Sequence, residues 1–202
     1  MYGEDIEVLT DNPRAVAVSR RNVGFSPRHE GVAIYDDGVA RASATQGHTG
    51  SNRITTSASA TTLYGYNNET TEFGFRRITV SATGVQEEVV RTGLLSDFGV
   101  DIEYDGGRVY ATNGAVVDPV ALTRVGTFPT SGIVEPDATN GRVHFFSGTT
   151  LNTMHYTNFT LIGSLTINAA SGSGTLIRWG TNGLAFGGGN QVVIIRSLYV
   201  VP

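Results

Sequence analysis

The sequence contains no cysteine and no lysine, and few of its residues carry a charge. Without cysteine, the chain of 202 residues can form neither a disulfide nor a thiolate metal site, which is compatible with any cellular compartment. All 14 basic residues are arginine, and charged residues make up 16% of the chain. The net charge of −4 and the lack of a basic stripe with interleaved aromatic residues argue against nucleic acid as a partner.

Long apolar runs are also missing. No stretch reaches the roughly 18 apolar residues that a spanning helix needs, so we expect no membrane span. The first residues lack the basic region and the apolar core of a signal peptide, and the sequence predicts none in this chain. Low charge with many small hydroxylated residues is typical of bacterial extracellular proteins. We therefore expect an extracellular or cell-surface location, although a GC-rich genome alone would also replace lysine by arginine.

Helical periodicity is absent as well. Glycine, serine, threonine and asparagine interrupt every long window, and no segment carries an apolar stripe at helical spacing. Apolar residues instead alternate with small polar ones between turn residues. Residues 107–128 read as three short strands separated by Asn113-Gly114 and Asp118-Pro119. The sequence predicts an all-β chain built from meanders.

The meander recurs along the chain. Residues 141–148 repeat residues 107–114 with a shift of 34, and residues 162–165 repeat residues 125–128 with a shift of 37. A single twisted sheet cannot bury its own faces, whereas sheets stacked around an axis bury each other. We therefore predict a β-propeller of about five four-stranded blades. A right-handed parallel β-helix is the alternative, but its coils would be shorter and would lack hairpin turns such as residues 36–38, Asp-Asp-Gly.

The spacing of the units supports this fold. Successive units start 39, 46, 33 and 42 residues apart, close to the roughly 40–50 residues of known propeller blades, at Ala15, Ile54, Val100, Ile133 and Thr175. The expected single domain then divides into blades at residues 13–52, 53–93, 94–130, 131–170 and 171–202.

Residues 4–10 form a strand with no partner before it. The sequence allows two arrangements of this strand and the five blades. This strand closes a five-bladed ring as the outermost strand of the last unit, or the five blades belong to a larger ring. Residues 198–202 could also supply that outer strand.

Two segments resemble a known family. Residues 107–114, GRVYATNG, followed by VDP at 117–119 and VGT at 125–127, resemble the YVTN-type repeat of bacterial and archaeal surface-layer propellers. Residues 178–186, RWGTNGLAF, are similar to a signature of propeller domains in secreted bacterial proteins. The resemblance covers nearly the whole chain from Pro13 to Ser197, with a looser match in the first two units. It implies a scaffold fold and no catalytic residue, and rings in that family commonly have seven or eight blades.

The histidines give no sign of a metal site, because the four of them, His29, His48, His144 and His155, are scattered without metal-binding spacing. The sequence therefore predicts no metal and no cofactor. His144 takes the position of Tyr110 in its repeat, which favours an aromatic-sized side chain that fills space in a strand.

Two Glu-x-Asp pairs recur at matching points of two blades: Glu103 with Asp105, and Glu135 with Asp137. These carboxylates could converge on a central channel and hold a divalent cation. Alternatively, the two aspartates stabilise the hairpins through bonds to the backbone, which aspartate does well. Because the pairs recur at turns, we favour the second interpretation.

Loops on a rigid scaffold commonly carry binding residues. In a propeller the loops between second and third strands share one face with the connections between blades. On this loop face, next to the connection 46–52, the candidate binding residues are His29, Glu30, Asn68, Glu69, Glu72 and Asp97. The leading hypothesis is a non-enzymatic scaffold that binds a protein or glycan there, or serves as a structural module of a larger protein. The alternative is a propeller enzyme, a lactonase-like hydrolase with a divalent metal held by channel carboxylates.

Overall fold

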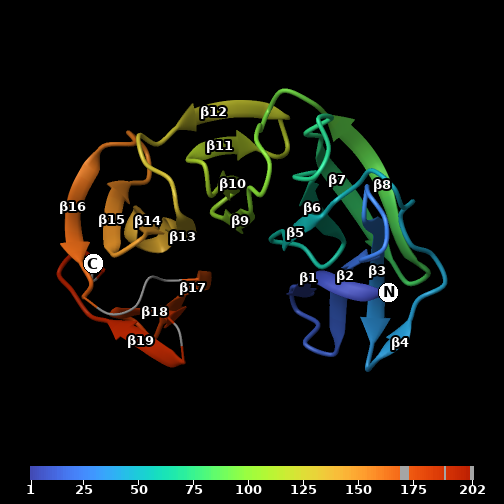
Figure 1. Cartoon of the computed structure of the whole chain (residues 1–202), viewed down its shortest axis with the longest axis horizontal. Coiled ribbons are helices and arrows are strands. Elements are labelled where there is room, and N and C mark those ends of the chain that lie inside the picture. Colours follow the sequence, from blue (N-terminus) through green and yellow to red (C-terminus); the bar gives the residue numbers. More distant parts are fainter. Residues whose placement is uncertain (169–172, 189, 201–202) are drawn as a thin grey trace.

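The computed structural model describes residues 1–168, 173–188 and 190–200, and its regular elements are strands apart from one short 3₁₀ helix. Five antiparallel sheets follow one another along the chain, and each pairs its strands in sequence order. Figure 1 shows the sheets arranged along an arc around a common centre. The predicted all-β propeller of meander blades is confirmed.

Each sheet is one blade, numbered here in chain order. Blade 1 contains β1 (Tyr2–Val8), β2 (Ala15–Arg21), β3 (His29–Asp36) and β4 (Val39–Ala40). Blade 2 contains β5 (Arg53–Thr56), β6 (Thr62–Tyr66), β7 (Phe75–Ser81) and β8 (Gly84–Arg91). Blade 3 contains β9 (Ile102–Asp105), β10 (Arg108–Ala111), β11 (Ala115–Asp118) and β12 (Thr123–Thr127).

Blade 4 contains β13 (Ile133–Asp137), the 3₁₀ helix η1 (Ala138–Asn140), β14 (Arg142–Ser147), β15 (Thr150–His155) and β16 (Leu161–Thr166). Blade 5 contains β17 (Ser173–Trp179), β18 (Gly183–Gly188) and β19 (Gln191–Ile195). The first strand of every blade lies nearest the centre of the arc, and each of these inner strands contacts the inner strand of the next blade (Figure 1).

The hydrophobic core lies between the blades. Four clusters of buried side chains fill the four junctions between consecutive blades. Small and aliphatic residues such as Ala17 and Leu63 fill the junction of blades 1 and 2, whereas aromatic residues such as Tyr110 and Phe145 fill that of blades 3 and 4. Each blade therefore depends on its neighbour for burial, as expected for stacked repeats.

The turns follow the chemistry read from the sequence. Asp37 and Gly38 turn β3 into β4 with φ values of 46° and 85°. Gly106 and Gly107 turn β9 into β10 with φ values of 55° and 82°. Both pairs have the left-handed backbone that a two-residue hairpin turn requires.

The N-terminal strand differs from the expectation that residues 4–10 close the ring. β1 pairs with β2, from Tyr2 opposite Arg21 to Val8 opposite Val16, and is the innermost strand of blade 1. A turn produces this pairing, because the Asn12 N–H donates to the Leu9 carbonyl at 3.0 Å. Blade 1 therefore starts at β1 rather than at residue 13, and β1 does not join blade 5.

The other expected closing segment was residues 198–202. Residues 198–200 form a turn, so blade 5 has three strands in the part of the chain that is described. Residues 201–202, Gly189 in the predicted turn 187–190, and the predicted blade boundary at 170–171 lie outside the described residues.

No helix long and apolar enough to cross a membrane is found among the described residues.

Candidate functional site

The loop face predicted from sequence uses most of its polar groups within the protein. Glu69 accepts hydrogen bonds from the Arg28 N–H at 2.8 Å and from Asn52 Nδ2 at 3.1 Å, and an ion pair joins it to Arg28. These contacts hold the loop between β6 and β7 against blade 1. The Glu69 carboxylate is therefore a link between two blades.

Three further candidates on this face also have internal partners. Glu72 forms an ion pair with the buried Arg76 at 2.7 Å. Asn68 Nδ2 donates to the Val100 carbonyl at 2.9 Å, and Asp97 accepts from Ser96 Oγ at 3.0 Å and from Asn113 Nδ2 at 3.2 Å. Burial alone would raise the pKa of Glu72, but hydrogen bonds from Arg76 and Asn67 outweigh it and hold that pKa below its usual value.

His29 and Glu30 are the remaining two candidate binding residues of the loop face. His29 is buried at the start of β3, and a Cβ at Gly50 would lie 2.3 Å from its ring. Burial, helped by three nearby arginines, lowers the pKa of His29 to about 4, so the ring is neutral at neutral pH. Glu30 is half-buried and has no hydrogen bond or ion pair to the described residues. The structure thus brings the candidates onto one face, but only Glu30 keeps a free charged group there.

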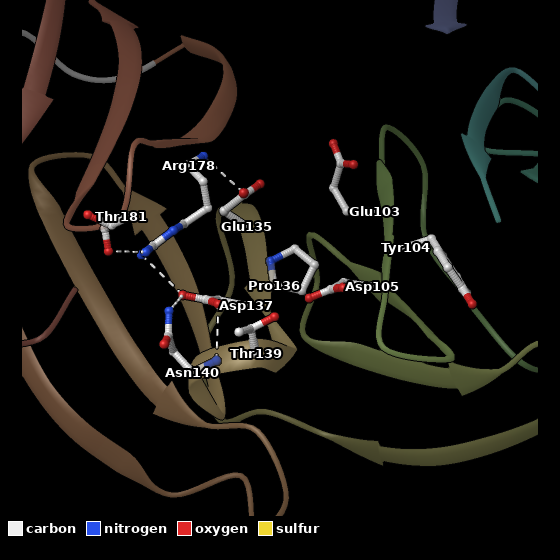
Figure 2. A pocket seen from close by; sticks show the side chains of 10 residues that line it. All are labelled: Glu103, Tyr104, Asp105, Glu135, Pro136, Asp137, Thr139, Asn140, Arg178 and Thr181. Carbon is white, nitrogen blue, oxygen red and sulfur yellow. Dashed lines mark hydrogen bonds and ion pairs between the residues drawn. The ribbon is translucent and has the colours of Figure 1, made fainter. Parts of the chain in front are cut away.

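A polar pocket lies at the opposite end of the inner strands. It has a volume of about 570 Å³, and Figure 2 shows the side chains that line it at the ends of β9, β13 and β17. Its lining residues are Glu103, Tyr104, Asp105, Glu135, Pro136, Asp137, Thr139, Asn140, Arg178 and Thr181. The turns between first and second strands form this end, whereas the loops between second and third strands form the other. We call this site the channel pocket.

The two aspartates of the Glu-x-Asp pairs have structural partners at the pocket. Asp137 caps η1, because its Oδ1 accepts the Asn140 N–H at 3.2 Å. This confirms the turn-stabilising interpretation for Asp137. Asp105 differs, since its Oδ2 accepts the Ala138 N–H of blade 4 at 2.6 Å and so bridges two blades instead of stabilising its own hairpin.

Side-chain oxygens also bridge neighbouring inner strands at equivalent positions. Thr55 Oγ1 accepts the Tyr104 N–H of the next blade at 3.1 Å, and Glu135 Oε1 accepts the Arg178 N–H of the next blade at 3.0 Å. Thr55 stands opposite Tyr64, and Glu135 stands opposite His144, on the second strand of its own blade. The bridge therefore recurs at a fixed place in the repeat.

Glu103 occupies the same place in blade 3, opposite Tyr110. Pro136 of blade 4 is the equivalent of Tyr104 in blade 3, because Pro136 pairs with Val143 and Tyr104 pairs with Val109. Pro136 is therefore the residue whose N–H would donate to Glu103. Proline has no backbone N–H, so this bridge cannot form. Glu103 has no hydrogen-bond or ion-pair partner among the described residues, and Figure 2 shows its side chain apart from the bonded groups.

Several carboxyl groups lie close together along the inner strands. Burial raises the pKa of Glu103 to about 9, with further contributions from Glu7, Asp101, Glu135 and Asp5. Burial likewise raises the pKa of Glu135 to about 7 and that of Asp5 to about 6. At neutral pH Glu103 is therefore a protonated acid that can donate a hydrogen bond.

Arg178 is the cation of the channel pocket. Its Nη1 lies 3.1 Å from Asp137 Oδ2, and its Nη2 donates to the Thr181 carbonyl at 2.8 Å (Figure 2). In the described ranges, no three His, Asp or Glu side chains form a group that could hold a metal ion. The pocket thus offers hydroxyl, amide and carboxyl groups of both donor and acceptor character.

His144 behaves as its repeat position predicted. It is fully buried on β14, its Nδ1 lies 3.0 Å from Thr153 Oγ1, and burial lowers its pKa to about 4. Pro136, Arg178 and Asn140 were not among the site residues predicted from the sequence. The proline inside the second Glu-x-Asp pair was the available signal, since it removes a donor from an inner strand.

Comparison with known proteins supports the propeller fold. No protein-family model matches the sequence, and no curated protein sequence matches it. Among solved structures, the chain is similar to a chain of the hydrazine synthase of Kuenenia stuttgartiensis, with a TM-score of 0.68 and 12% sequence identity. The match covers 91% of this chain and 55% of that chain, so this chain spans about half the length of the other. At this identity the likeness concerns the fold alone, and the YVTN-type family stays a prediction.

Proposed function

We propose that the protein is a non-enzymatic β-propeller scaffold that binds a short glycan in the channel pocket. The observation that carries this proposal is Glu103, a carboxyl group left without a partner by Pro136 and exposed to a cavity of about 570 Å³. Glu103 is half-buried at this cavity, so a ligand can bond to its carboxyl group in place of water.

The chemistry of the lining fits a sugar. Sugar hydroxyls donate and accept hydrogen bonds at once, and the pocket supplies both kinds of partner. Glu103 donates when protonated, Glu135 and Asp105 accept, and the hydroxyls of Thr139 and Thr181 do either. A volume of about 570 Å³ falls within the range of roughly 300–1,000 Å³ for small-molecule sites.

A location in a bacterial extracellular protein is part of the same proposal. It rests on the low charge, the abundance of small hydroxylated residues and the resemblance to secreted propellers. The alternative remains an enzyme with a metal held by channel carboxylates, of which Asp105 and Asp137 each accept a backbone N–H.

The test is isothermal titration calorimetry with cellobiose, maltose and N,N′-diacetylchitobiose. We expect at least one of these probes to bind the natural sequence, and Glu103→Ala to weaken that binding at least tenfold. Glu30→Ala is the matched control, since it removes the free carboxylate of the loop face. Equal loss of affinity in both variants, or binding by none of the probes, would contradict the proposal. Loss only in Glu30→Ala would move the site to the loop face.

A further inference from the structure

A second cavity lies along the same inner strands as the channel pocket. It has a volume of about 380 Å³, and residues of β1, β5, β9 and β17 line it. Glu103 lines both cavities, so they meet at this side chain. The channel pocket extends from Glu103 toward Asp105, and the second cavity extends the other way, toward Asp101. The two cavities thus follow one path along the inner strands.

This path is longer than a disaccharide. Asp101 and Asp105 are four residues apart on extended chain, which corresponds to about 13 Å at roughly 3.3 Å per residue. Asp101 lines only the second cavity of the two, and Asp105 lines only the channel pocket. A disaccharide in the channel pocket therefore leaves the second cavity to further sugar units.

Arg53 is the cation of the second cavity, and its contacts are loose. Its Nη1 lies 3.8 Å from Asp5 Oδ1 and 3.6 Å from Asp101 Oδ2, beyond the usual hydrogen-bond distance. Backbone N–H groups hold both carboxylates in place. Asp5 Oδ2 accepts the Ile54 N–H at 2.8 Å, and Asp101 Oδ1 accepts the Ile102 N–H at 2.9 Å. A sugar hydroxyl can therefore accept from Arg53 and donate to a fixed carboxylate beside it.

Glu7 and Thr175 add further polar groups to the same cavity. Glu7 is half-buried on β1 and, like Glu103, has no hydrogen-bond or ion-pair partner among the described residues. Thr175 is exposed on β17, where its side chain lines the second cavity but not the channel pocket. Donors and acceptors thus continue past Glu103, as a chain of sugar units requires.

The charges along the path select against acidic glycans. In the second cavity four carboxyl groups surround the single arginine, and they belong to Asp5, Glu7, Asp101 and Glu103. In the channel pocket Arg178 already contacts Asp137 and two backbone carbonyls. A carboxylate or sulfate on the ligand would meet like charge at both positions without a free cation, which is costly.

Given the proposed binding of a glycan in the channel pocket, on which this step rests, we infer that the ligand is a linear oligosaccharide longer than a disaccharide and without acidic groups. It lies along the inner strands and fills both cavities, with Glu103 at the point where they meet. Arg53 and its two aspartates bind the units that a disaccharide lacks.

The first experiment uses the natural sequence alone, so it does not depend on how any variant folds. Calorimetry compares cellotetraose, maltotetraose and tetra-N-acetylchitotetraose with the matching disaccharides. We expect the tetrasaccharide of the series that binds to be held at least tenfold more tightly than its disaccharide. Equal affinities would overturn this inference and leave the proposed function standing, whereas binding by no probe would overturn both. Tetragalacturonic acid should bind at least tenfold more weakly than the neutral tetrasaccharide, and equal binding would contradict the exclusion of acidic glycans.

The second experiment locates the additional sugar units. Thr175→Trp fills the second cavity without removing a charged group, and we expect it to bring the ratio of tetrasaccharide to disaccharide affinity close to one. Thr123→Trp is the matched control, since Thr123 is exposed on the outer strand β12, and this variant should keep the natural ratio. Circular dichroism checks that both variants fold. A natural ratio in folded Thr175→Trp would overturn the inference, because the additional units would then lie outside the second cavity.

Discussion

The charged groups at the two ends of the inner strands differ in whether they have partners within the protein. At the loop face the buried Arg76 is bonded to Glu72 and Glu87, so both carboxylates have a cationic partner. At the channel pocket Glu103 is left without a partner, because the next blade presents a proline. A bonded ion pair stabilises a fold, whereas a carboxyl group without a partner in the protein is available to a ligand. Ion-paired carboxylates thus lie at one end of the inner strands, and a carboxyl group without a partner lies at the other.

Among the substitutions that test this difference, the removal of Arg76 should change the free energy of unfolding most. Arg76→Ala leaves two partly buried carboxylates without their cation, which we expect to lower the free energy of unfolding by about 3–5 kcal/mol. Urea unfolding followed by circular dichroism measures the change. Arg77→Ala is the neighbouring control, since Arg77 pairs with the exposed Glu88 and its loss should cost about 1 kcal/mol or less. Equal losses in the two variants would show that the buried network has no special role.

A tighter test of the loop face is Gly50→Ala. The new Cβ would lie 2.3 Å from the His29 ring, and the backbone of Gly50 has no left-handed φ to add strain. We expect a loss of about 1–3 kcal/mol from overpacking, measured by the same urea titration. Gly24→Ala is the control, because its nearest contact is the Asn22 side-chain oxygen at 3.6 Å. A change below about 0.5 kcal/mol at Gly50 would mean that this face repacks freely.

At the channel pocket the effect of a Glu103 substitution on stability should depend on pH. The folded-state pKa of Glu103 is raised from 4.5 to about 9, so the folded state binds this proton more tightly than the unfolded state does. Its contribution to stability is therefore complete below about pH 4.5 and is lost as the pH rises toward 9. Glu103→Gln cannot ionise, and we expect it to be more stable than the natural protein by about 2 kcal/mol at pH 9 and by little at pH 5.

Thermal or urea unfolding at several pH values measures this difference. The expected difference of about 2 kcal/mol is smaller than the free energy that the whole pKa shift would give, because water in the open pocket screens the charge of Glu103. Glu30→Gln, on the loop face, is the control, because Glu30 does not line the channel pocket. Parallel stability profiles for the natural protein and Glu103→Gln between pH 5 and pH 9 would show that Glu103 ionises freely and is not held protonated.

The fold could be predicted from sequence because its signals are local and repeated. Turn residues such as Asp37-Gly38 and Gly106-Gly107 set the hairpins, and the spacing of the meanders set the number of blades. The place of β1 was predicted wrongly, because the turn residues 11–13 indicate that the chain reverses but not which strand β1 pairs with.

The candidate site was harder to predict for a physical reason. Sequence reasoning placed exposed, charged residues on the loop face, but it could not show that Glu69 and Glu72 meet arginines from distant or neighbouring positions. It also treated Glu103 and Glu135 as equivalent. Their difference lies in the residue opposite on the next blade, Pro136 in one case and Arg178 in the other, and that contact exists only once the blades are stacked.

The smallest effect should come from giving Glu103 the partner that it lacks. Pro136→Ala restores an N–H at the position where Tyr104 and Arg178 donate to the preceding blade. A hydrogen bond to a carboxylate contributes about 1.5–3 kcal/mol, and losing the proline costs roughly 0.4–1 kcal/mol through the unfolded state, so we expect a net gain of about 1 kcal/mol at pH 9. Because the bond favours the charged carboxylate, the pKa of Glu103 should fall, which NMR titration of its side chain measures. If that pKa does not change, the proline is not what leaves Glu103 unpaired, and the contrast between the two ends of the inner strands has another cause.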